Sequence, residues 1–172
     1  MKGVLKSEII LGIDPGFGRI GFALVKEQGQ DFKVQEYGCL ETPQNTSQYH
    51  RLLLIFEKVK GLIKKNKPDV VAMEEIFFGR NVTTAFQVGK AHGVVQLAST
   101  QSNIPVVYYT PAHIKISVTG YGHADKTQIQ KMVKSILHLR EIPKPDDAAD
   151  ALAIALTHSF RRNSNFKLDA RR

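Results

Sequence analysis

In the first part of the chain, apolar residues gather in short runs that turn residues separate. Residues 9 to 13 form an apolar run that ends at Asp14-Pro15-Gly16, as expected for a buried strand followed by a turn. Residues 21 to 26 and 32 to 40 are two further strand-like runs, joined by a polar segment that contains a glycine. These three runs predict an antiparallel meander.

The pattern then changes to a helical period. From residue 48 to residue 66, apolar side chains recur every three or four positions, and lysines occupy the opposite side. This spacing predicts an amphipathic helix that packs on the sheet through Leu52, Ile55, Phe56, Val59, Leu62 and Ile63.

The rest of the chain alternates strands with helices. Residues 69 to 73 and 105 to 109 are strand-like, and residues 83 to 102 between them are helical in pattern. This order is a βαβ unit, which implies parallel pairing and a right-handed crossover. Residues 127 to 139 and 148 to 160 predict two more helices. The sequence therefore predicts an α/β fold with a mixed five-stranded sheet flanked by helices.

The composition fits one globular domain. With 172 residues, 42% of them hydrophobic, the chain can bury a core without disulfides. We expect a single domain over residues 1–160 and a basic tail, which need not be ordered, over residues 161–172. The single cysteine, Cys39, has no partner for an intramolecular disulfide. No apolar run is long enough to span a bilayer and no secretory signal pattern is present, so we expect a cytoplasmic protein.

The charge balance favours polyanionic partners. There are 24 Lys and Arg residues against 16 Asp and Glu, which gives a net charge of +8 and an isoelectric point near 9.6. Part of this charge lies in the tail, where it could simply be solvated. Basic composition therefore suggests nucleic acid without identifying a site.

A glycine cluster offers one candidate site. Gly16, Gly18 and Gly21 match the G-x-G-x-x-G pattern of dinucleotide-binding loops, with Glu41 at the distance expected for a ribose contact. In such loops the third glycine opens a helix whose N-terminus faces the pyrophosphate. The residues after Gly21 continue as a strand-like run instead. This context counts against a dinucleotide, but a small-molecule-binding α/β domain stays open as an alternative.

Carboxylates offer a second candidate site. Asp14 ends the first predicted strand, Glu74 and Glu75 follow the strand at residues 69 to 73, and Asp147 and Asp150 stand at the start of the last helix. Carboxylates at the ends of neighbouring strands can converge, and residues three apart on a helix share a face. An oxygen-only cluster suits Mg²⁺ or Mn²⁺, as in two-metal phosphodiester sites.

Each of these carboxylates also has a simpler interpretation. Asp14 before Pro-Gly is a common turn residue, and Asp146 and Asp147 at a helix start are typical of caps or first-turn charges. Only one of Glu74 and Glu75 can face the cluster, because side chains alternate along a strand. Asp150 lies further into a largely apolar helix, where a carboxylate is costly without a partner.

Four sequence blocks carry a more specific signal. They are GIDPGFGRIGFALV at residues 12–25, AMEEIFFGRN at 72–81, VTGYGHADKTQIQKMV at 118–133 and DDAADALAIALTH at 146–158. In this order and spacing the chain resembles the RuvC-type crossover junction endodeoxyribonucleases, the bacterial Holliday-junction resolvases, from about residue 9 to residue 158. The resemblance implies a ribonuclease-H-like fold.

It also implies an activity and a ligand set. The family's metal ligands fall on Asp14, Glu74, Asp147 and Asp150, which would hold Mg²⁺, with Mn²⁺ as a substitute, as two ions per subunit. Family members are homodimers that nick two opposing strands of a four-way junction symmetrically in recombination and repair. They use a metal-activated water, leave 5′-phosphate and 3′-hydroxyl ends, and work beside a branch-migration helicase complex.

The resemblance extends to DNA contacts. Phe77 matches the family's aromatic residue that stacks on an unpaired base, and Lys115 and Lys126 match lysines near the scissile phosphate. Arg80 and Asn81 would flank the same DNA path. His123 stands where relatives usually have a small residue, and a solvent-facing loop histidine is its simplest interpretation. A catalytically silent junction-binding protein is the alternative function, which would require a missing ligand.

Overall fold

The computed structural model describes residues 6–76 and 82–169. Within these ranges a single five-stranded sheet has the strand order β3-β2-β1-β4-β5. The strands are β1 (Ile9–Asp14), β2 (Arg19–Gln28), β3 (Asp31–Glu41), β4 (Val70–Glu74) and β5 (Val106–Tyr109). The pairs β1–β2 and β2–β3 are antiparallel, whereas β1–β4 and β4–β5 are parallel. This arrangement confirms the predicted mixed sheet, the meander and the βαβ unit.

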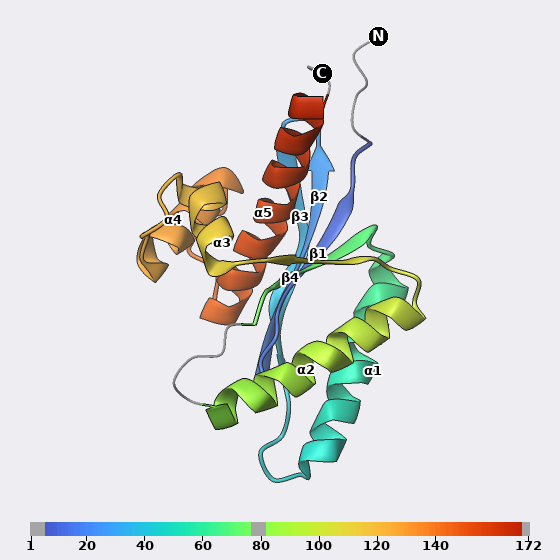
Figure 1. The fold of residues 1–172 in the computed structure, drawn as a ribbon. Helices are drawn as coiled ribbons and strands as arrows, with labels where there is room; N and C mark the ends of the chain where they lie inside the picture. The colour runs from blue at the N-terminus through green and yellow to red at the C-terminus, as the bar shows by residue number, and fades with distance from the viewer. Residues whose placement is uncertain (1–5, 77–81, 170–172) are drawn as a thin grey trace.

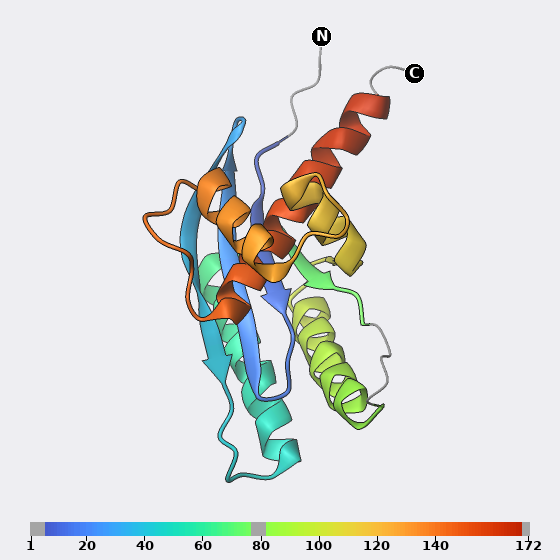
Figure 2. The ribbon, with the colours of Figure 1, turned by 90° about the vertical axis from the view of Figure 1, so that its left-hand side faces the viewer.

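Helices cover both faces of the sheet, as Figures 1 and 2 show. The helices α1 (Gln48–Asn66) and α2 (Val82–Gln101) lie on one face, and α3 (Pro111–Thr119), α4 (Lys126–Ile136) and α5 (Asp146–Asp169) lie on the other. Strand pleating separates two cores. Leu11 and Ile13 of β1 face α1 and α2, whereas Ile10 faces α5. None of the helices in the described ranges is long and apolar enough to cross a membrane.

Helix α3 has no counterpart in the sequence prediction. Its nine residues are too few and too evenly apolar to show a helical period. Its ends, however, carry readable signals. The Thr110 side chain caps the helix by accepting from the His113 N–H, Pro111 occupies its first turn, and Gly120 ends it with φ +74°.

Helix α5 is also longer than predicted and lies directly against the sheet backbone. It continues to Asp169, through most of the segment predicted as a tail, so the division at residue 160 stays a prediction. Two sheet glycines allow the close approach. A Cβ atom on Gly12 would lie 2.2 Å from the carbonyl oxygen of Ala151, and one on Gly21 would lie 1.9 Å from that of Asp147. The sheet therefore determines the position of α5 at its N-terminal end.

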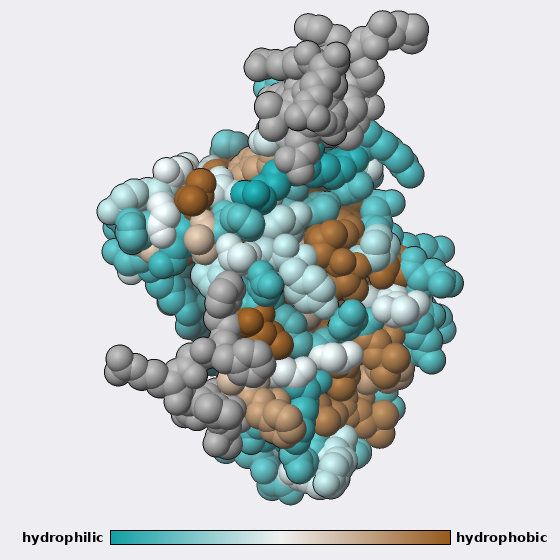
Figure 3. All heavy atoms as spheres, in the orientation of Figure 1, coloured by the Kyte–Doolittle hydropathy of each residue, from teal (hydrophilic) through white to brown (hydrophobic). Residues whose placement is uncertain are grey.

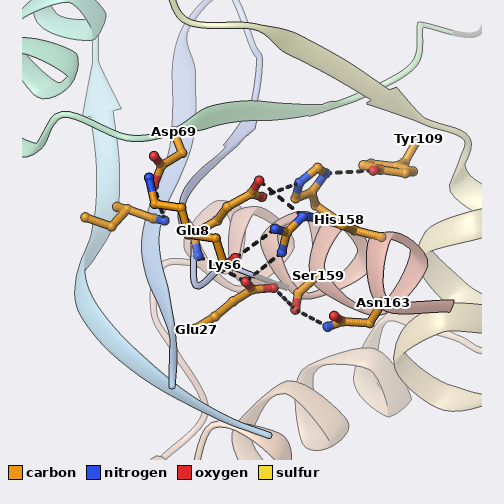
Figure 4. Close-up of polar contacts among 10 residues, drawn as sticks. Lys6, Glu8, Glu27, Asp69, Tyr109, His158, Ser159 and Asn163 are labelled. Carbon is orange, nitrogen blue, oxygen red and sulfur yellow. Dashed lines mark hydrogen bonds and ion pairs between the residues drawn. The ribbon is translucent and has the colours of Figure 1, made fainter. Parts of the chain in front are cut away.

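A network of charged and polar side chains fixes the C-terminal half of α5 (Figure 4). The buried Glu27 carboxylate accepts from Arg162 Nη1 at 2.9 Å and from the Ser159 hydroxyl. His158 bridges the Tyr109 hydroxyl at 2.8 Å and the Glu8 carboxylate at 3.1 Å. Because the buried charges are paired, removal of one side chain would leave its partner's charge buried without compensation. The free energy of unfolding would then fall by about 3 kcal/mol or more. The network joins α5 to β2, to β5 and to Glu8, the residue before β1.

Candidate active site

The predicted strand-end carboxylates lie side by side on the face of the sheet that α5 covers. Parallel pairing aligns Ile13 with Met73, so Asp14 and Glu74 are the next residues of β1 and β4. Strand alternation places Glu74 on the same side as Ala72, which packs in the core beneath α5. Glu75 is exposed. The sheet thus directs Glu74, and not Glu75, toward Asp14.

The start of α5 brings its own carboxylates to the same place. Asp14, Glu74 and Asp150 line one pocket together with Lys115 of α3 and Lys126 of α4. Asp147 does not line this pocket but lies close enough for its charge to act on Asp14. The structure therefore brings three of the four predicted ligands and both predicted lysines to one pocket, and Asp147 lies near it.

Burial and mutual repulsion make this group of carboxylates hard to ionise. Burial, followed by the charges of Asp150, Glu74 and Asp147, raises the pKa of Asp14 from 3.8 to about 7. Burial, followed by the charge of Asp150, raises the pKa of Glu74. The pKa of Asp150 is also raised by burial, although Lys126 opposes the rise. Concentrated negative charge of this kind is relieved by a bound cation.

Two basic side chains pair with the carboxylates of α5. Lys126 Nζ lies 2.7 Å from Asp146 Oδ2 and 3.0 Å from Asp150 Oδ2. Arg19 Nη2 lies 2.8 Å from Asp147 Oδ2. That oxygen is buried and makes no hydrogen bond of acceptable geometry with the residues that the structure describes, so the contact with Arg19 is an ion pair that leaves acceptor capacity on Asp147.

The four candidate ligands carry the oxygen donors that a hard divalent cation prefers. All four are carboxylates, and one oxygen of Asp147 has no hydrogen-bond partner among the described residues. Burial, together with neighbouring negative charge that a cation would offset, raises the pKa values of Asp14, Glu74 and Asp150. In the part of the chain that the structure describes, no three His, Cys, Asp or Glu side chains are arranged closely enough to share one ion. Lys126 and Arg19 partly neutralise the carboxylates in this arrangement.

The remaining predicted site residues lie outside the described residues or outside the lining of the pocket. Phe77, Arg80 and Asn81 lie outside the described residues. His123 is exposed and packs edge-on against Tyr121, with ring centroids 5.7 Å apart.

The glycine cluster leads into β2, which begins at Arg19, so the helix that a dinucleotide loop requires is replaced by a strand. Two partners were not predicted from the sequence: Arg19 for Asp147 and Asp146 for Lys126. The one indication was that both residues lie inside the quoted sequence blocks, Arg19 in the first and Asp146 in the fourth.

Comparisons with known proteins show which family the chain belongs to. The family described as "Crossover junction endodeoxyribonuclease RuvC" matches residues 10–158. A protein of that name from Desulfitobacterium hafniense is 50% identical over 155 residues, which cover 90% of this chain and 94% of the relative. Another, from Halothermothrix orenii, is 46% identical over 157 residues, which cover 90% and 95%.

Solved structures give the same result. "T. thermophilus RuvC in complex with Holliday junction substrate" is 35% identical, with a TM-score of 0.88 over 92% of this chain and 97% of that one. The yeast mitochondrial Holliday junction resolvase Ydc2, at 14% identity and a TM-score of 0.61 over 91% and 83%, shares the fold. The chain belongs to the RuvC family of crossover junction endodeoxyribonucleases.

Proposed function

We propose that this nuclease resolves four-way DNA junctions by paired, symmetric nicks, with Asp14, Glu74, Asp147 and Asp150 binding Mg²⁺. The observation that carries the proposal is the convergence of carboxylates from β1, β4 and α5 at one pocket that two lysines also line. A homologous protein of known structure was solved with a Holliday junction. The products would carry 5′-phosphate and 3′-hydroxyl ends, as required for ligation in recombination and repair.

The carboxylates would hold two Mg²⁺ ions, with Mn²⁺ as a substitute. Bound there, the ions would lower the pKa of the attacking water and stabilise the leaving oxygen. The fold of the protein holds the four carboxylates in position. Asp14 and Glu74 are fixed by strand pairing, whereas Asp147 and Asp150 are fixed by the packing of α5 on Gly21 and Gly12. A rigid frame of this kind keeps the reacting phosphate in line with the water.

Positive side chains would bind the DNA around the carboxylates. Lys115 and Lys126 line the pocket and would contact the scissile phosphate or its neighbours. Phe77 would stack on an unpaired base near the crossover, and Arg80 and Asn81 would flank the same DNA path. The net charge of +8 supports the same partner.

An exposed stripe on α2, made of Phe86, Gly93 and Leu97 with Lys90 between Phe86 and Gly93, favours a homodimer. Phe86 is 63% exposed and Leu97 is 59% exposed, and Gly93 between them leaves room for a second helix. Apolar side chains gather over α2 on the face that Figure 3 shows. Two-fold pairing through this stripe would present two active sites to a two-fold junction. A cytoplasmic branch-migration helicase complex would be a further partner.

Replacement of neighbouring glutamates tests the site. Glu74→Gln removes a ligand charge, and we expect it to lower the nicking rate about 100-fold. Glu75→Gln changes the adjacent exposed side chain, and we expect a rate within about twofold of wild type. The measurement is single-turnover nicking of a labelled synthetic four-way junction, with linear duplex of the same sequence beside it, in Mg²⁺ or EDTA.

Each result of this experiment has a definite meaning. Nicking of the junction alone, dependent on Mg²⁺ and lost only in Glu74→Gln, would support the proposed function. Binding without nicking by the wild-type protein would favour the junction-binding alternative. Equal effects of the two substitutions would contradict the assignment of Glu74.

Replacement of an apolar residue on α2 tests the dimer. We expect Leu97→Glu to convert the protein to a monomer, because a charge would be buried in the interface. Ile116→Glu, a change at a comparably exposed residue of α3, should leave the dimer intact. Analytical ultracentrifugation of both variants measures the outcome, and a monomeric wild-type protein would contradict this interface.

A further inference from the structure

We propose that Asp146 is a positioning residue that keeps the Lys126 ammonium at the rim of the carboxylate pocket, where it can meet the scissile phosphate. The inference rests on the proposed function, because it assigns how one lysine of that site is held. Asp146 is not one of the four candidate metal ligands, and it lies outside the lining of the pocket.

The backbone of Lys126 is held in place independently of its side-chain contacts. Lys126 is the first residue of α4, directly after the N-cap Asp125. Asp125 Oδ1 accepts from the Gln128 N–H at 2.8 Å, and Gln128 Oε1 accepts from the Asp125 N–H at 2.8 Å. This capping box holds the start of α4 in place, so the direction of the Lys126 side chain depends on its own partners.

Those partners are two carboxylates on α5 that differ in position. The ammonium lies 2.7 Å from Asp146 Oδ2 and 3.0 Å from Asp150 Oδ2. Asp150 lines the pocket beside Asp14 and Glu74, whereas the Asp146 side chain is about half exposed, at 53%. The shorter contact is therefore made with the carboxylate outside the pocket.

Metal binding would remove one of the two partners. A carboxylate that coordinates a divalent cation no longer attracts an ammonium, because the cation repels the lysine. With Asp150 as its sole partner, Lys126 would then turn toward solvent. Asp146 supplies a second negative charge that stays free of the metal, so the ammonium stays next to the pocket and can contact the phosphate.

The pair has little value as a source of stability. The Lys126 side chain is 52% exposed and that of Asp146 is 53% exposed, and ion pairs at such exposure contribute about 0 to 1 kcal/mol to folding. Asp146→Asn should therefore fold normally. Its effect should be on the nicking rate, and only while Lys126 is present.

A double-mutant cycle tests this dependence. The cycle uses the full-length wild type, Asp146→Asn, Lys126→Gln and the double variant, each assayed for single-turnover nicking of a four-way junction in Mg²⁺ and for junction affinity in EDTA. We expect Asp146→Asn to lower the rate about five- to tenfold while changing the junction Kd by less than about twofold. Lys126→Gln should lower the rate about 100-fold, and the double variant should match it.

Two further variants complete the test. Asp146→Glu should restore the rate to within about twofold, because it keeps the charge. Glu36→Gln removes a similar exposed lysine pair, that of Glu36 Oε2 with Lys65 Nζ at 2.8 Å, and should have no effect on the nicking rate.

Three outcomes would overturn the proposal for Asp146. They are an unchanged rate in Asp146→Asn, an equal loss in the presence and absence of Lys126, and a loss that Asp146→Glu does not restore. A wild-type protein that binds the junction but fails to nick it would overturn the proposed function together with this inference.

Discussion

Asp14→Asn is expected to abolish nicking and, without divalent metal above pH 7, to make the protein more stable than the wild type. The carboxylate is surrounded by the charges of three others, so its loss should lower the single-turnover rate at least about a thousandfold. Junction binding should persist, because the basic residues that contact DNA are unchanged.

The gain in stability follows from the raised pKa of Asp14. The folded pKa is about 7 and the ordinary value is 3.8, so the folded state holds the Asp14 proton more tightly than the unfolded state. The contribution of Asp14 to stability is therefore full below about pH 4 and is lost as the pH rises through 7. At 1.36 kcal/mol per pH unit, the loss amounts to about 2 to 4 kcal/mol. Asparagine has no charge to bury and avoids this loss.

Urea unfolding in EDTA between pH 4 and pH 8 measures the effect. The difference in unfolding free energy between Asp14→Asn and wild type should grow from about pH 4 to pH 7 and then level off. Added Mg²⁺ should reduce the difference, because it stabilises the wild type more than the variant. Glu57→Gln, a change at an exposed residue of α1, should show no such trend. A pH-independent difference would contradict the raised pKa of Asp14, which burial and the neighbouring carboxylates cause.

The sheet and the longer helices could be predicted from the sequence because each has a strong local pattern. The run at residues 9 to 13 indicates a buried strand by its own composition, and the apolar spacing from Gln48 to Asn66 gives both ends of α1. Helix α3 lacks such a period and was missed, although Thr110, Pro111 and Gly120 marked its ends. The strength of the apolar pattern, more than the length of an element alone, decides which elements can be predicted from the sequence.

The site was predictable only in part, for a physical reason. Strand ends and helix starts indicate where Asp14, Glu74 and Asp150 stand along the chain. The ion pairs of Lys126 with Asp146 and of Arg19 with Asp147 depend on how α4 and the β1–β2 turn pack against α5. No local pattern encodes those contacts. They involve charged side chains whose simplest interpretation, taken alone, is a solvated surface or a helix cap.

The same packing makes Gly21 a sensitive position, and Gly21→Ala is expected to impair both folding and nicking. Gly21 pairs with Asp14 across β1 and β2, so it lies at the centre of the site. A Cβ atom there would be 1.9 Å from the carbonyl oxygen of Asp147 and 2.5 Å from its carbonyl carbon. Both atoms belong to the backbone, which no side-chain rotation can move aside. The start of α5 must therefore shift away from the sheet.

The shift should separate the carboxylates of α5 from those of the strands. Overpacking of this kind costs about 1 to 3 kcal/mol or more, and a displacement of about 1 Å at a reacting site lowers rates about 100-fold. We therefore expect Gly21→Ala to lose about 3 kcal/mol of unfolding free energy and more than 100-fold in nicking rate. Urea unfolding and single-turnover nicking, measured on the same preparation, check both values.

A second glycine provides the matched control. Gly61 lies within α1, where an added Cβ would meet nothing within 4 Å, so Gly61→Ala should raise stability by about 0.5 to 1 kcal/mol and leave nicking unchanged. Comparison of Gly21→Ala with Gly61→Ala separates the effect of an added methyl group on stability and nicking from the effect of its location. If Gly21→Ala nicked at the wild-type rate, α5 could move without disturbing the ligands, and its close packing on the sheet would not be what positions Asp147 and Asp150.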